Sequence, residues 1–214
     1  MMPAVLRYSG LPIAALLLSS CALTKGADEH VLLRIAPPLI HDGPDAWQGD
    51  VKLVPVRAQG LVSQMRYVYA LGDGSALQQA RTLSWDRPPP EYLHEALVAA
   101  LRGKGLRVLK SGETGASAIR MAPTLVHFEE RSGPGTLAAV TFDLEIQREG
   151  KPALVRRYCG AAPIRSAHAS ARAAAFSAAL GSAVQAFRQE SPEKTPSGAS
   201  SGTDCAASLP SSSR

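Results

Sequence analysis

A histidine and two glutamates in the middle of the chain are the first residues whose types could do chemistry. His127 and Glu129 share one face of a predicted strand and Glu130 follows them, which suits a general acid–base pair. The sequence places no nucleophile or second histidine at a telling spacing from them. We therefore favour a solvated sheet face and predict no catalytic residues.

Metal, phosphate and nucleic-acid chemistry have no better support. Asp42, Asp45 and Asp50 could offer oxygen ligands, but their spacing fits no calcium loop, and the sequence has no metal-type cluster of Cys and His. Neither a Gly-x-Ser-x-Gly elbow nor a phosphate loop is present. The basic residues are scattered along a chain of net charge +5. We therefore predict no cofactor, no metal, no nucleic-acid partner and no enzymatic activity.

Trp85 and Arg87 are the two residues that we single out for contact with a partner protein. An aromatic side chain beside basic residues and three prolines could form an exposed patch. The alternative is that Trp85 packs beneath the proline-rich segment before the first helix. We give that alternative the greater weight.

The first 21 residues have the layout of a secretory signal. Arg7 supplies the positive charge, residues 11–18 form a short apolar run, and the small residues Ser19 and Ser20 precede Cys21. The run is too short to cross a bilayer as a helix, which takes about 20 apolar residues. An ordinary signal peptide with a chance cysteine at its end is the alternative.

The string Leu18-Ser19-Ser20-Cys21 resembles a bacterial lipobox. In that class of signals the cysteine is acylated, for example with palmitate, becomes the first residue and holds the protein on a membrane. Residues 1–20 would then be removed. Ala22 and Leu23 follow the cysteine in place of the aspartate typical of inner-membrane lipoproteins, which implies the outer membrane, facing the periplasm. Residues 22–29 form a tether that reaches at most about 28 Å.

The two remaining cysteines are Cys159 and Cys205. An oxidising periplasm permits a disulfide between them. Because Cys205 lies in a serine-rich tail, we favour two separate thiols, although the sequence alone leaves the question open.

The predicted acylated cysteine and its tether span residues 21–29. We predict one ordinary domain over residues 30–189. Residues 190–214 are rich in Ser, Pro and Gly, which is typical of a disordered tail. Hydrophobic periodicity predicts helices at 91–102 and 167–189, and strands at 30–35, 51–57, 65–71, 106–109, 119–129, 137–147 and 153–162. Residues 137–147 alternate strictly between apolar and polar, which is typical of an antiparallel sheet covered on one side. We predict an α+β fold with a mostly antiparallel sheet and two helices packed on one face.

The order of these cues resembles the ABC-type transport auxiliary lipoproteins over residues 30–189. The resemblance rests on short cues in a fixed order, closed by the alanine-rich last helix: Leu32-Leu33 with Pro37 and Pro38, Val54-Pro55-Val56, Gly60-Leu61 with Met65 and Tyr67, and Trp85 with Pro88 and Pro89 ahead of Leu93 and Leu97. The serine-rich tail and Cys159 depart from the family pattern.

The resemblance implies a membrane-anchored, non-enzymatic auxiliary subunit of a phospholipid transport system. Its partners would be an MCE-domain protein and an ABC permease and ATPase, and its acyl anchor would hold it to the membrane. Two alternatives remain open: an assembly or plug lipoprotein for an outer-membrane β-barrel, and an anchored cell-wall enzyme. The missing catalytic constellation argues against the enzyme.

Overall fold

The computed structural model describes residues 29–38, 49–71, 76–102, 106–110, 112–113, 115, 118–132 and 135–189. Cys21, most of the tether, Asp42, Asp45 and the tail from residue 190 lie outside the described residues, so the predictions made for them stay predictions.

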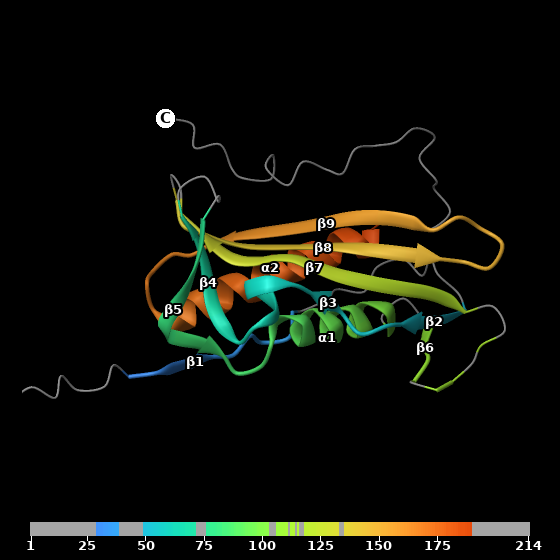
Figure 1. The fold of residues 1–214 in the computed structure, drawn as a ribbon, viewed down its shortest axis with the longest axis horizontal. Helices are drawn as coiled ribbons and strands as arrows, with labels where there is room; N and C mark the ends of the chain where they lie inside the picture. Colours follow the sequence, from blue (N-terminus) through green and yellow to red (C-terminus); the bar gives the residue numbers. More distant parts are fainter. Residues whose placement is uncertain are drawn as a thin grey trace, which may run out of the picture.

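The described residues form nine strands, two α-helices and one short 3-10 helix (Figure 1). The helices are α1 (Pro89–Arg102) and α2 (Ala169–Gln189), and η2 (Gly60–Ser63) is the 3-10 turn. The strands are β1 (Val31–Leu33), β2 (Asp50–Leu53), β3 (Arg57–Ala58), β4 (Arg66–Leu71), β5 (Ala76–Trp85), β6 (Arg107–Val108), β7 (Ile119–Arg131), β8 (Leu137–Gln147) and β9 (Leu154–Pro163). None of the helices in this part of the chain is long and apolar enough to cross a membrane.

Strand β7 is the centre of a single mixed sheet. On one side it pairs with β8, which pairs with β9, and both pairs are antiparallel. On the other side it pairs in parallel with β2, β3 and β4 at different points along its length. The path from β4 continues through β5 to β1, and the path from β2 continues to β6.

The prediction of a mostly antiparallel sheet is therefore wrong, while the α+β class with two helices is confirmed. Five of the eight strand pairs among the described residues are parallel. The parallel pairs are short, joining two or three residues each, and a strand of that length carries no readable alternation. The prediction of an antiparallel sheet therefore rested on the alternation in the long strands, which do pair in antiparallel.

Local chemistry explains where the strands break or begin. Pro55 separates β2 from β3, because a proline has no N–H to donate to a sheet. Strand β5 was not predicted, since its two glutamines and its alanines interrupt any apolar alternation. In contrast, β8 runs over the predicted residues, and Val140, Phe142 and Leu144 are fully buried.

An aromatic cluster forms the centre of the core between the sheet and the helices. Trp85 is fully buried, and its ring centroid lies 4.9 Å from that of Phe176 in α2 and 5.2 Å from those of Phe128 and Tyr67. Tyr92 from α1 packs edge-on to Trp85. One continuous core thus joins both helices to the same face of the sheet.

Helix α2 lies unusually close to the edge strand β9. A Cβ atom on Gly160 would lie 2.0 Å from the backbone oxygen of Ala179, so only glycine fits there. The alanines of α2 allow this approach, and its larger side chains, among them Phe176, Leu180 and Phe187, are buried against the sheet.

Cys159 on β9 is disulfide-bonded, which corrects the prediction of a free thiol at this position. Cys21 and Cys205 lie outside the described residues.

Candidate functional site

The segment between β5 and α1 places Trp85 and Arg87 in different environments. Trp85 has no exposed surface, so it cannot contact a partner protein in this fold, and the alternative of a packed Trp85 is the one that the structure contains. Arg87 comes two residues later, at the surface, with 29% of its side chain exposed. Pro88 precedes α1, and Pro89 and Pro90 form the start of its first turn, where a proline is tolerated because its missing N–H has no partner within the helix.

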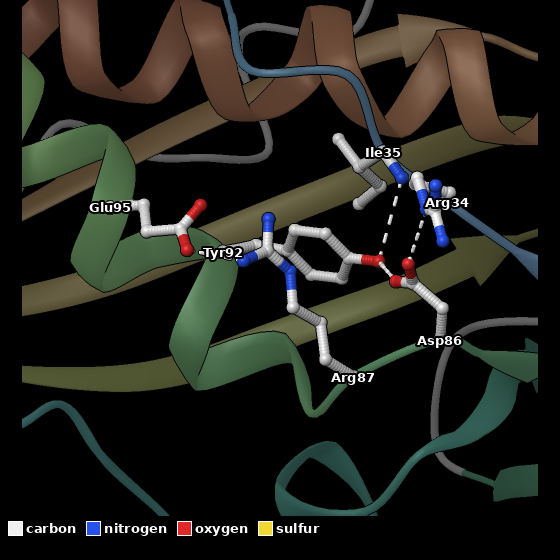
Figure 2. Close-up of polar contacts among 6 residues, drawn as sticks. All are labelled: Arg34, Ile35, Asp86, Arg87, Tyr92 and Glu95. Carbon is white, nitrogen blue, oxygen red and sulfur yellow. Dashed lines mark hydrogen bonds and ion pairs between the residues drawn. The ribbon is translucent and has the colours of Figure 1, made fainter.

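Arg87 belongs to a polar network that joins β1, the end of β5 and the first turns of α1 (Figure 2). Its guanidinium carbon lies 4.4 Å from the centre of the Tyr92 ring, and its Nη1 donates to Glu95 one turn further along α1. A cation over an aromatic face is attracted by the ring quadrupole. Arg87 is therefore fixed by two contacts with α1, the helix that it precedes.

Tyr92 and Asp86 continue the network toward β1. The Tyr92 hydroxyl donates to Asp86 Oδ1 and accepts from the backbone N–H of Ile35 at 3.5 Å. Arg34 Nε donates to Asp86 Oδ2 at 2.6 Å. Figure 2 shows Asp86 between the Tyr92 hydroxyl and Arg34, so one carboxylate clamps the end of β1 to α1.

The protonation states in this network suit a structural clamp rather than proton transfer. Burial, together with the hydrogen bond to Asp86, raises the pKa of Tyr92 to about 12. Burial alone would raise the pKa of Asp86, but the hydrogen bonds from Tyr92 and Arg34 outweigh it and hold that pKa below its ordinary value. At neutral pH the tyrosine stays neutral and the aspartate stays ionised, so neither is poised as an acid or base.

An apolar groove of about 740 Å³ lies beside this network, between the segment after β1 and the outer face of α2. Its walls are mostly small residues, and Arg34 is the one charged side chain among the described residues that line it. Ser177 Oγ donates to the Ala36 carbonyl at 2.9 Å and so ties the two walls together. The described lining residues are Arg34, Ala36, Pro37, Pro38, Ser170, Ala173, Ala174, Ser177, Ala178, Gly181, Ser182 and Gln185.

The structure brings His127 and Glu129 together and turns Glu130 to the other face of the sheet. His127 and Glu129 lie on the sheet face away from the helices, with His127 Nδ1 3.3 Å from Glu129 Oε1, and Arg131 contacts the same oxygen at 2.9 Å. Burial opposes ionisation of Glu129, but the contacts with His127 and Arg131 prevail and lower its pKa. Glu129 is thus a paired carboxylate rather than a poised base.

Glu130 points to the opposite face, toward the helices. Tyr67 donates to its Oε2 at 2.5 Å and Arg172 of α2 donates to the same oxygen at 3.0 Å. Burial, with the hydrogen bond to Glu130, raises the pKa of Tyr67 far above its ordinary value. Within the described ranges no group of three or more His, Cys, Asp or Glu side chains could hold a metal ion. Asp50, the described member of the aspartate trio, instead pairs with Arg107.

The sequence offered no signal for most of the network around Arg87. Arg34 and Asp86 are 52 residues apart, and no spacing rule joins them. Arg87 and Glu95 are eight residues apart, beyond the three or four residues at which helix neighbours meet. Arg87 reaches Glu95 because it precedes α1 and folds back over Tyr92 (Figure 2).

Most of the described domain matches a known protein family. The family model of the ABC-type transport auxiliary lipoprotein component matches residues 35–187. No curated protein matches the chain in sequence.

Two of the solved structures that match show the same fold. The crystal structure of protein XCC0632 from Xanthomonas campestris has a TM-score of 0.63 at 17% identity, covering 74% of this chain and 92% of that one. The crystal structure of an uncharacterized protein has a TM-score of 0.53 at 16% identity, covering 75% and 95%.

Proposed function

Because the chain belongs to the ABC-type transport auxiliary lipoprotein component family, we propose that it is a non-enzymatic subunit of an MCE-type phospholipid transport system. In this role the domain does not turn over a substrate. It supports an MCE-domain protein and an ABC permease and ATPase that move phospholipid between membranes. The match over residues 35–187 is the observation that carries the proposal.

The proposed anchor is Cys21, acylated within Leu18-Ser19-Ser20-Cys21. Several acyl chains on one cysteine would hold the protein on a membrane without a second signal, whereas a single chain binds only marginally. Ala22 and Leu23 after the cysteine favour the outer membrane, so the domain would face the periplasm.

Arg87 is the residue that we retain for contact with a partner protein. It lies at the surface, and its contacts with Tyr92 and Glu95 hold the guanidinium in one position, which reduces the ordering cost when a partner binds. Trp85 would act only indirectly, by packing beneath this segment.

A crosslinking experiment in intact cells tests the transport role. The tagged protein is crosslinked in the cell envelope, purified and analysed by mass spectrometry, with Cys21→Ser as the matched variant. We expect an MCE-domain protein and its permease with the wild type and a strong loss of both with Cys21→Ser. Recovery of an outer-membrane β-barrel in their place would support the assembly role and contradict the transport role.

Metabolic labelling with a radioactive fatty acid tests the anchor separately. The wild-type protein should incorporate label and Cys21→Ser should not. Continued labelling of Cys21→Ser would show that the acyl chain is elsewhere.

A further inference from the structure

The margin of the domain around β1 combines exposed apolar and basic side chains. Leu33 and Ile35 point into the core, so the alternating residues His30, Leu32 and Arg34 lie on the outside. Leu32 is 60% exposed and the Arg34 side chain is 81% exposed. A large apolar side chain thus lies between two side chains that can carry positive charge.

The start of β4 extends this margin. Ser84 of β5 pairs with Leu32 on one side and with Arg66 on the other, so both neighbours project from the same face of the sheet. Met65 precedes Arg66 and is 43% exposed. Its carbonyl accepts a hydrogen bond from the backbone N–H of Trp85 at 2.6 Å. Leu32 and Arg66 therefore share one face of the sheet beside Ser84, and Met65 lies next to Arg66 where the chain enters β4.

The chain reaches this margin directly from the proposed anchor. Only residues 22–29 separate Cys21 from His30, and eight residues extend at most about 28 Å. Strand β9 is at the other end of the path that runs from β1 through β7, and Figure 1 shows β1 and β9 on opposite sides of the molecule. The β1 end is thus the part of the described domain that the tether brings nearest to the lipid.

We propose that the β1 margin, formed by His30, Leu32, Arg34, Met65 and Arg66, rests on the phospholipid surface that holds Cys21. The inference depends on the proposed anchor. The basic side chains face lipid phosphates, and Leu32 and Met65 enter the boundary between headgroups and acyl chains. The margin also holds Glu29 and Asp86, and Asp86 pairs with Arg34, so the exposed apolar side chains contribute more to the contact than net charge does.

A weak contact between the β1 margin and the lipid is enough to orient the domain. Once Cys21 is in the membrane, contact by the margin becomes an intramolecular event at high effective concentration. The margin would then fix the orientation of the domain, with β9 turned away from the lipid.

Photocrosslinking with a matched pair of residues tests the proposal. Val155 on β9 is 62% exposed, nearly the same as Leu32, and is also an aliphatic residue in a strand. A photoreactive phenylalanine derivative replaces either residue in the full-length protein expressed with its signal. The purified product is reconstituted into vesicles of phosphatidylethanolamine and phosphatidylglycerol that carry radiolabelled acyl chains. Flotation of the vesicles reports the anchor independently of crosslinking.

We expect both variants to float and position 32 to acquire about tenfold more labelled lipid than position 155. Equal labelling of floating protein would overturn the proposed surface and leave the anchor intact. Crosslinking of position 32 in cells to a protein and not to lipid would also overturn it. Failure to float would contradict the anchor, and with it both the proposed function and this surface. A third variant at Met65 guards against misfolding at position 32 and should behave as Leu32 does.

Discussion

Gly160 of β9 and Ala179 of α2 meet through their backbones, with no room for a side chain between them. A Cβ added to Gly160 would lie 2.0 Å from the Ala179 oxygen and 2.7 Å from the Ala183 nitrogen. Since both obstacles are backbone atoms, neither can rotate away. This contact sets the distance between the last helix and the edge of the sheet.

Gly160→Ala should therefore destabilise the fold strongly. The added methyl group must displace α2 or β9, and overpacking of this kind typically costs about 1–3 kcal/mol, with larger values where backbone must move. The measurement is the free energy of unfolding in urea. Gly135→Ala is the matched control, because nothing lies within 4 Å of a Cβ at that position, and we expect it to change stability by less than about 0.5 kcal/mol. Equal effects of the two variants would contradict the close packing.

Tyr92→Phe tests the clamp between β1 and α1. The variant keeps the ring beneath Arg87 but removes the hydroxyl that donates to Asp86 and accepts from Ile35 N–H. Loss of a hydrogen bond to a charged group should cost about 1.5–3 kcal/mol in the free energy of unfolding. Tyr69→Phe is the control, since the described contacts give the Tyr69 hydroxyl no hydrogen bond, and we expect a change within about 0.5 kcal/mol. A Tyr92→Phe protein as stable as the wild type would show that the clamp contributes nothing.

The elements that could be predicted are those whose residues carry their own pattern. Strand β8 alternates over eleven residues, and the apolar stripes of α1 and α2 repeat over several turns. The helices begin within two residues of the predicted positions. In these segments the local sequence alone shows which side chains are buried, because the apolar face of each must be covered.

The parts that could not be predicted depend on distant partners. The parallel direction of β1 beside β5 follows from the path of the chain between them, and the three residues of β1 hold no information about it. The same reasoning applies to Arg34 and Asp86, which meet only because β1 lies next to the end of β5. For Trp85, local composition allowed an exposed patch or the packed position that we favoured, and the structure places the ring at the centre of the core.

The clamp also predicts how stability depends on pH. The pKa of Asp86 in the folded protein lies below the ordinary value of 3.8, so folding favours its ionised form. This contribution is complete above the unfolded pKa and is lost as the pH falls through the folded pKa. Asp86→Asn should therefore be less stable than the wild type at pH 7, and the difference should shrink below about pH 4. Urea unfolding of both proteins at several pH values measures it. A difference that stays constant down to pH 3 would contradict a charged role for Asp86.

Two arginine–carboxylate pairs differ in how far their side chains are exposed to water, so they should differ in their contribution to stability. Arg172 and Glu130 have side chains that are 22% and 12% exposed, whereas Arg157 and Asp143 are 47% and 27% exposed. Removing Arg172 leaves Glu130 largely buried, with the Tyr67 hydroxyl as its one remaining donor among the described side chains, and an uncompensated buried charge is destabilising. We expect Arg172→Met to lower the free energy of unfolding by about 2–3 kcal/mol, below the range for fully buried pairs because water still reaches this one. Arg157→Met should cost less than about 1 kcal/mol, as exposed pairs do. If the two variants were equally stable, Glu130 would not require its arginine for folding.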